Sequence, residues 1–409
     1  MSFFLLIIYI AYIIYTLCSY YKKEYGVYQL PFLIACVNLT FVLPQMIAIY
    51  GVTENPDRSL SMTLFMIVSC NLAINIGFGL NRKLPLGQFA SISFTNGSKL
   101  VIALFILVGF LAYMMNRGVY RGGMISGQYV IISFFVGFLQ YALILCFLVY
   151  KRRIISKRTF WILASFVILV YLDKTFMTGR RNDAIRIILI VSYFIFYLSG
   201  NNKLYRKFRW FIPAFFILGM IGNTQIEEYR SNAYDDVSLG QNISTLDFSQ
   251  AKNSLLSNTK GEVNNAVLGI ENCYEHGYYD FGAYDWNRII HDFVPQILVG
   301  SQGKKSLMIS TPSQGLERKL TRTGSTMTGY YDAFASFGIF GFVKFLVIAL
   351  FMGILWRMQE RSDICKLMYF AMLVNTMHIV THTTSYFSNA LIFFLIFVSP
   401  FLVLVRKKV

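Results

Sequence analysis

The chain has 409 residues, of which 56% are hydrophobic and 17% aromatic, whereas only 14% are charged. Apolar runs long enough to cross a lipid bilayer recur from end to end, which excludes an ordinary soluble globular protein and indicates a polytopic membrane protein. The net charge of +17 comes mostly from short clusters of Lys and Arg between these runs. It therefore indicates orientation in a membrane, and no nucleic-acid partner is expected.

Hydropathy predicts an all-α protein with about eleven transmembrane helices, the first of which we interpret as a retained helix rather than a cleaved signal peptide. Their approximate limits are 3–20, 28–50, 60–79, 99–115, 128–150, 159–177, 183–200, 208–222, 331–356, 364–381 and 386–405. The predicted parts of the chain are eight spans in residues 1–222, a long and partly helical outer loop in 223–330, and three spans in 331–409.

Basic clusters after alternate spans predict the orientation of the chain. Lys and Arg follow the odd-numbered spans, within residues 22–23, 82–83, 151–158, 203–209, 357–366 and 406–408. Because loops rich in Lys and Arg remain in the cytoplasm, the N-terminus is predicted to lie outside and the C-terminus in the cytoplasm. The long loop between the eighth and ninth spans then lies outside.

Two arginines depart from this charge rule. Arg180 and Arg181, in the stretch TGRRNDAI, lie in a short outer loop at the start of the seventh span. A helix N-terminus is already electropositive, so two guanidinium groups are unfavourable there unless an anion binds. The structural alternative is that they pair with Asp173 or Asp183, or contact lipid headgroups.

The long outer loop carries a candidate general base. Its stretches GEVNNAVLGIENCYEHG and DWNRIIHDFVPQIL have the periodicity of amphipathic helices. In the second stretch, Arg288, His291 and Asp292 fall on one helical face, and a histidine beside a carboxylate suits proton transfer. The alternative is the ordinary polar face of a surface helix.

Two further clusters lie at the ends of this loop. In NTQIEEYRSN, Glu227 or Glu228 can act as a base or orient Arg230, and a surface ion pair is the simpler alternative. Before the ninth span, the stretch TRTGSTMTG can present amide and hydroxyl groups to a phosphate, beside Arg322. Lys344 falls inside the ninth span, so it needs a partner or a wet cavity.

No cofactor and no metal are predicted. The six cysteines form no closely spaced pair of the kind that binds zinc. His378 and His382 are four residues apart, but the intervening residues lack the glutamate of a zinc-protease motif. They are interpreted as pocket-lining or interfacial histidines.

Three stretches carry a resemblance to a known family: TGRRNDAI at the start of a mid-chain span, VPQILVGSQGKK in the long outer loop, and the following STMTGYYDAFASFGIFGF. They resemble the Wzy-type polymerases of O-antigen and other oligosaccharide repeat units. The resemblance implies a GT-C-related glycosyltransferase of the bacterial inner membrane whose active site faces the periplasm. Its donor would be a glycan on polyprenyl pyrophosphate, such as undecaprenyl pyrophosphate, and its acceptor a new lipid-linked repeat unit.

The resemblance also implies roles for individual residues. The leaving pyrophosphate needs cations, which without a metal would be Arg180, Arg181, Arg288, Arg322 and Arg230. The attacking sugar hydroxyl needs a base, for which His291 is the first candidate and Glu227 or Glu228 the second. A chain-length regulator of the Wzz type is an implied partner, in addition to the membrane lipids.

Two other functions share parts of this pattern. An O-antigen ligase would use the same donor and the same outer arginines with a different acceptor. A lipid-linked oligosaccharide flippase is the alternative that is not an enzyme, but a flippase is expected to place charges along a central cavity, often between repeated halves. Here the unusual charges gather in outer segments and no internal repeat is visible, so the flippase ranks third, after the polymerase and the ligase.

Overall fold

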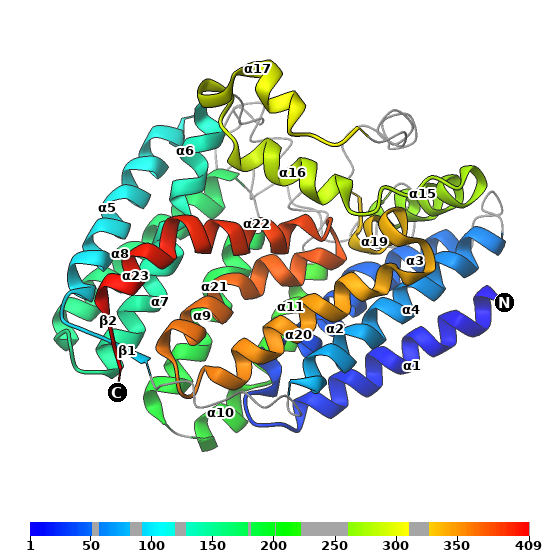
Figure 1. Cartoon of the computed structure of the whole chain (residues 1–409). Helices are drawn as coiled ribbons and strands as arrows, with labels where there is room; N and C mark the ends of the chain where they lie inside the picture. Colours follow the sequence, from blue (N-terminus) through cyan, green and yellow to red (C-terminus); the bar gives the residue numbers. More distant parts are fainter. Residues whose placement is uncertain are drawn as a thin grey trace, which may run out of the picture. The chain divides into compact units, whose positions relative to one another are not determined.

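A computed structural model describes residues 1–50, 57–81, 92–118, 128–178, 181–200, 202–221, 261–310 and 327–408 of the chain (Figure 1). Within these residues, ten helices are long and apolar enough to cross a membrane. Apart from one short two-stranded ladder, the regular structure in this part of the chain is helical. The protein is therefore a polytopic, all-α membrane protein.

The ten helices agree with the predicted spans to within a few residues, and the eighth predicted span is the exception. Its described part is α11 (Phe211–Ile221), which has 11 residues. The residues that follow Ile221 lie outside the described ranges. The predicted count of eleven spans therefore stays a prediction, as do the predicted boundaries of the outer loop at 223 and 330.

The chain forms two compact units, each assembled from segments far apart in the sequence. The first unit draws its described residues from 1–85, 254–357 and 375–393, and the second from 86–253, 358–374 and 394–409.

The first unit is built around α4, which packs against α1, α2 and α19 (Figure 1). Its elements are α1 (Ser2–Tyr21), η1 (Gly26–Tyr28), α2 (Leu30–Val37), the π-helical turn η2 (Asn38–Val42), α3 (Leu43–Tyr50), α4 (Asp57–Leu80), α15 (Glu262–His276), α16 (Ala283–Phe293), α17 (Gln296–Ser306), α19 (Gly329–Phe337), the 3₁₀ turn η4 (Gly338–Gly341), α20 (Phe342–Met358), η5 (His378–Val380) and α22 (Ser385–Phe393). Together, α19, η4 and α20 form one span.

A buried polar network fixes the start of α19 in this bundle. The amide of Asn38 donates to Asn71 Oδ1 at 2.9 Å, and the amide of Asn71 donates to the Tyr330 hydroxyl at 3.0 Å. The hydroxyls of Tyr9 and Tyr330 both donate to Asn38 Oδ1, at 2.7 and 2.8 Å. Polar groups inside a bilayer need partners within the protein, so these four side chains satisfy one another and set the position of α19.

The stretch GEVNNAVLGIENCYEHG forms the predicted amphipathic helix, α15, which packs against α3 and α4. Its buried face includes Val263 and Ile270. The side chain of Gln45, in α3, accepts the Val263 N–H at 3.1 Å. The guanidinium group of Arg58, at the start of α4, stacks over the Tyr274 ring at 3.9 Å.

The second amphipathic stretch does not form the single helix that its pattern predicts. It divides into α16 and α17 around Pro295, because a proline has no N–H to donate and its ring disfavours helix in the residue before it. The chain then folds back on α16. Trp286 Nε1 donates to Leu307 O at 2.8 Å, and the Asn287 side chain pairs with both backbone groups of Ile309 at 2.7 and 2.8 Å.

Of the described spans, the second unit contains four whole and part of each of the last two (Figure 1). Its elements are β1 (Ile92–Phe94), α5 (Ser98–Arg117), α6 (Gln128–Val136), α7 (Phe138–Lys151), α8 (Lys157–Thr178), α9 (Arg181–Ser199), α10 (Asn202–Phe208), α11, most of α21 (Asp363–Met377), the π-helical turn η6 (Phe394–Val398), α23 (Ser399–Val405) and β2 (Arg406–Lys408). The strands β1 and β2 pair antiparallel, with Ile92 opposite Lys408.

Ion pairs join helix ends within the second unit. Each pair links two ends that alternating spans place on the same side of the membrane. At one end, Arg117, the last residue of α5, pairs with Asp173 near the end of α8 at 2.9 Å. At the other, Arg152, just after α7, pairs with Asp363 at the start of α21 at 3.0 Å. The hydrogen bond with Asp363 raises the pKa of the Arg152 guanidinium.

Candidate functional site

Two carboxylates on α16 hold this helix against the start of α22. Asp285 and Asp292 are seven residues apart, which places them on one face about two turns from each other. Asp285 Oδ1 accepts the Thr384 hydroxyl at 3.4 Å, and Asp292 Oδ2 accepts the Asn389 amide at 2.6 Å. Thr384 directly precedes α22 and Asn389 is the fifth residue of this helix, so the polar face of α16 lies along the start of α22.

Asp292 also holds the predicted Arg288 and His291 together. Arg288 Nε lies 2.9 Å from Asp292 Oδ2, and His291 Nδ1 lies 2.9 Å from Asp292 Oδ1. The Asp292 side chain is 7% exposed, whereas those of Arg288 and His291 are 46% and 62% exposed. With the Nδ1–H assigned as donor to the carboxylate, Nε2 remains an acceptor, as in an oriented general base.

A further cation lies beside this group. Lys304, from α17, donates to the backbone oxygen of His291 at 2.7 Å. Its ammonium group and the guanidinium group of Arg288, one turn before His291, make this edge of α16 positive. An anion such as a phosphate is favoured there.

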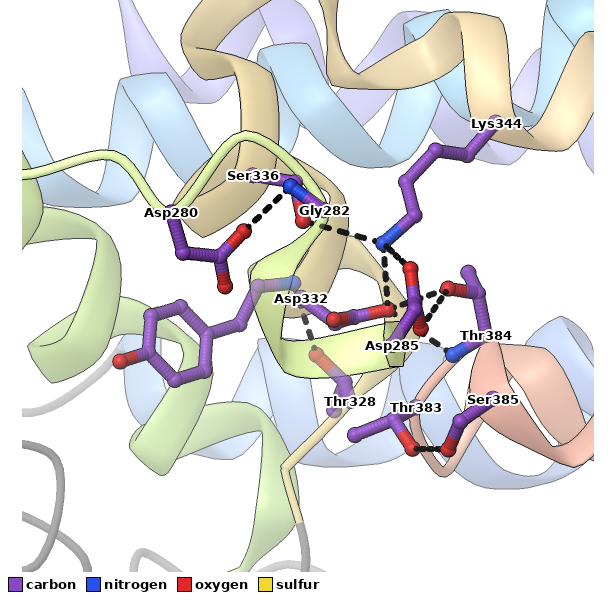
Figure 2. A network of polar contacts seen from close by, with 11 residues as sticks. Asp280, Gly282, Asp285, Thr328, Asp332, Ser336, Lys344, Thr383, Thr384 and Ser385 are labelled. Carbon is purple, nitrogen blue, oxygen red and sulfur yellow. Dashed lines mark hydrogen bonds and ion pairs between the residues drawn. The ribbon is translucent and has the colours of Figure 1, made fainter. Parts of the chain in front are cut away.

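Lys344 is neutralised by two carboxylates, as its predicted position inside a span requires (Figure 2). Its Nζ lies 2.6 Å from Asp285 Oδ2 and 3.2 Å from Asp332 Oδ2, and it donates to the Ser336 hydroxyl at 3.0 Å. The side chains of Lys344 and Asp332 are 12% and 3% exposed. Because so little water screens these charges, their mutual attraction is strong and fixes their geometry.

Asp332 connects this group to α22. Its carboxylate accepts the Thr384 N–H at 2.9 Å and also the Thr384 hydroxyl. A negative charge beside the N-terminus of a helix is favourable, because the backbone N–H groups there are unpaired. Figure 2 shows Asp285, Asp332 and Thr384 meeting around the end of the Lys344 side chain, which joins α16, α19, α20 and α22 at one point.

Asp285 lies outside the spans and is held in an environment that favours its protonated form. Burial raises the pKa of Asp285 to about 6, with a further increase from Asp332 and a smaller one from Asp280, although Lys344 lowers it. Burial also raises the pKa of Asp280, which accepts the Gly282 N–H at 2.8 Å. Burial thus favours the protonated form of Asp285, whereas Lys344 favours the ionised form.

The raised pKa of Asp285 predicts a dependence of stability on pH. The folded chain binds a proton at Asp285 more tightly than the unfolded chain does, so this contribution to stability grows as the pH falls through about 6. We expect the melting temperature of the wild type to rise relative to that of Asp285→Asn between about pH 7 and about pH 5. Melting curves of the full chain in detergent measure this difference, and a difference that is constant with pH would contradict the raised pKa.

A close backbone approach sets the start of α19 against the segment before α22. A Cβ atom added to Gly329 would lie 1.8 Å from Ile379 O and 3.0 Å from His382 O. Glycine at this position therefore lets α19 approach closely enough for Asp332 to reach Thr384.

This approach predicts that Gly329→Ala destabilises the protein by about 1–3 kcal/mol, because the backbone atoms around the new methyl group must shift. Gly79→Ala, in α4, is the matched control, since an added Cβ there has no atom within 4 Å and alanine favours a helix. Melting temperatures of the two purified variants test the prediction. Equal values would show that the packing around Gly329 is loose.

The two predicted histidines before α22 lie close together. The ring centroids of His378 and His382 are 5.6 Å apart, and the His382 ring is 4.8 Å from that of Tyr386. Burial lowers the pKa of His382 to about 4, so its imidazole is neutral at pH 7. The His382 ring therefore adds no positive charge to the surroundings of α22.

The predicted arginine pair belongs to the second unit. Arg181 begins α9, but its side chain and the whole of Arg180 lie outside the described residues. Near this helix start, Lys174 Nζ lies 3.0 Å from Asp183 Oδ1. Asp173, the other carboxylate that could neutralise the pair, binds Arg117. Anion binding by Arg180 and Arg181 stays a prediction.

The other predicted site residues, Glu227, Glu228, Arg230 and Arg322, also lie outside the described residues. Conversely, Asp285, Asp332, Thr384 and Lys304 were not predicted as site residues. The sequence does contain a signal for Asp285. This residue lies two helical turns before Asp292 in an amphipathic stretch, which places both carboxylates on the same helical face.

The cluster on α16 thus combines an oriented imidazole with a guanidinium and an ammonium group. Such a cluster can accept a proton from a hydroxyl group and stabilise negative charge on a phosphate. A comparison with family models, curated proteins and solved structures finds no match to this chain.

Proposed function

We propose that this protein is a glycosyltransferase that polymerises lipid-linked oligosaccharide repeat units of O-antigen or a related surface polysaccharide. The donor is a glycan on polyprenyl pyrophosphate, and the acceptor is a new lipid-linked repeat unit. In this proposal the protein lies in the bacterial inner membrane with its N-terminus outside and its C-terminus in the cytoplasm. Residues 223–330 then face the periplasm, and a chain-length regulator is a partner.

The observation that carries the proposal is the arrangement of His291 and Arg288 around the carboxylate of Asp292. His291 Nε2 takes the proton from the attacking hydroxyl of the acceptor, and the hydroxyl oxygen bonds to the anomeric carbon of the donor. The bond from that carbon to the pyrophosphate oxygen breaks, and the pyrophosphate leaves with the electron pair. Because pyrophosphate is a good leaving group, cations such as Arg288 suffice to stabilise its charge.

Other predicted residues keep the roles that the family resemblance implies. Arg180, Arg181, Arg230 and Arg322 are proposed as further phosphate contacts, and Glu227 or Glu228 as an alternative base. A polymerase fits the described cluster better than a flippase does, because a base oriented by a carboxylate is needed for bond formation and not for transport.

The glycans of a strain that lacks this protein test the proposal. A polymerase mutant attaches single repeat units to the final acceptor, and the wild-type gene restores the ladder of long chains on a gel. A ligase mutant would instead accumulate long lipid-linked polymer, and a flippase mutant would trap single lipid-linked units inside the cell. Either of these results would refute the polymerase.

A further inference from the structure

We propose that Lys344 and Asp285 are a positioning pair, which fixes α16 and its Arg288–His291–Asp292 cluster on the membrane-spanning helices of the first unit. That this positioning matters for catalysis rests on the proposed function, whereas the effect of the pair on the position of α16 does not.

The pair connects a membrane-spanning segment to a helix outside the candidate spans. Lys344 belongs to the candidate span Gly329–Met358, and Asp332, its second partner, belongs to the same span. Asp285 lies in α16, which is not among the candidate spans. Figure 2 shows the Lys344 side chain extending from α20 to the point where Asp285 and Asp332 meet.

The pair supplies a polar attachment on one face of α16. The hydrogen bond from Asn389 to Asp292 is another on the same face, about 10 Å along the helix from Asp285. With both attachments in place, neither end of α16 can turn away from α22. If Asp285 is lost, the contacts among Arg288, His291 and Asp292 remain, because all three lie on one helix. The cluster as a whole then moves relative to the spans.

The role of the pair is geometric rather than stabilising. Burying an ion pair costs desolvation energy that the attraction between the charges offsets only in part, and Asp285 carries this cost together with repulsion from Asp332. Replacing Asp285 therefore need not lower the stability of the whole protein. It removes the link that sets the distance between the base and a lipid-held substrate, and catalysis depends steeply on such distances.

Hydrogen exchange of the purified full chain in detergent, measured by mass spectrometry, tests the positioning. In Asp285→Ala, the amides of α16 are expected to exchange at least roughly tenfold faster, although alanine itself favours a helix. The amides of α15 and the melting temperature are expected to stay at their wild-type values. Asp285→Glu, which keeps the carboxylate, is expected to restore the protection of the α16 amides.

The matched control is Glu275→Ala, which removes an exposed carboxylate from α15 and should show wild-type exchange.

Glycan ladders from the same variants separate this inference from the proposed function. Faster exchange in α16 together with shortened ladders in Asp285→Ala supports the positioning pair and the proposed function, provided that Asp285→Glu restores the exchange rate and the ladders. Faster exchange with full-length ladders would leave the positioning pair standing and refute the assignment of the base to α16. Unchanged exchange in α16 would overturn the positioning pair. Loss of protection in α15 or a much lower melting temperature would also overturn it, because either result would show that Asp285 has a general structural role.

Discussion

Replacing His291 with alanine is expected to lower the rate of glycan polymerisation by about 10²- to 10⁴-fold, the usual contribution of a positioned general base. The fold should be unaffected, because the His291 side chain is 62% exposed. Asp292 would keep its bonds to Arg288 and Asn389, so α16 would remain docked on α22.

The matched control for this substitution is His276→Ala. His276 is also exposed, ends the neighbouring helix α15, and uses its Nδ1 to contact the Asn272 backbone oxygen at 3.0 Å. The initial rate of polymer formation is measured in membrane vesicles that contain the endogenous lipid-linked repeat units, with the protein level checked by immunoblot. Wild-type rates in His291→Ala, at a normal protein level, would exclude His291 as the base and leave Glu227 or Glu228 as the candidates.

The second large effect is expected for Lys344→Met, which should destabilise the protein by about 3–5 kcal/mol. The substitution leaves Asp332, whose side chain is 3% exposed, and Asp285 without the cation that neutralises them. Two buried carboxylates close together repel each other when no cation neutralises them. Low expression and a lower melting temperature in detergent are the observable results.

A combined variant distinguishes unpaired charge from lost packing at this position. Adding Asp285→Asn and Asp332→Asn to Lys344→Met removes all three charges, and neutral replacement of a buried ionic group is often tolerated. We expect this triple variant to recover most of the wild-type melting temperature. Lys305→Met removes an exposed lysine from α17 and should have no effect. A triple variant as unstable as Lys344→Met alone would show that the instability comes from altered packing and not from the unpaired carboxylates.

The sequence alone determined the membrane-spanning helices and the groups that share one helix. Hydropathy placed the limits of ten spans, because a bilayer requires long uninterrupted apolar segments. The contact of Arg288 with Asp292 followed from their spacing of four residues, which a helix brings onto one face whatever surrounds it. The need of Lys344 for a partner followed in the same way, from the cost of a charge inside a span.

The identity of the partners was decided by the tertiary structure. Thr384 meets Asp285 across 99 residues, and Asn389 meets Asp292 across 97 residues. No local period encodes such pairs, because they depend on which helices pack together and at what depth. The close approach of α19 to the residues before α22, which Gly329 permits, lets Asp332 reach Thr384. Burial there, rather than residue type, raises the pKa of Asp285.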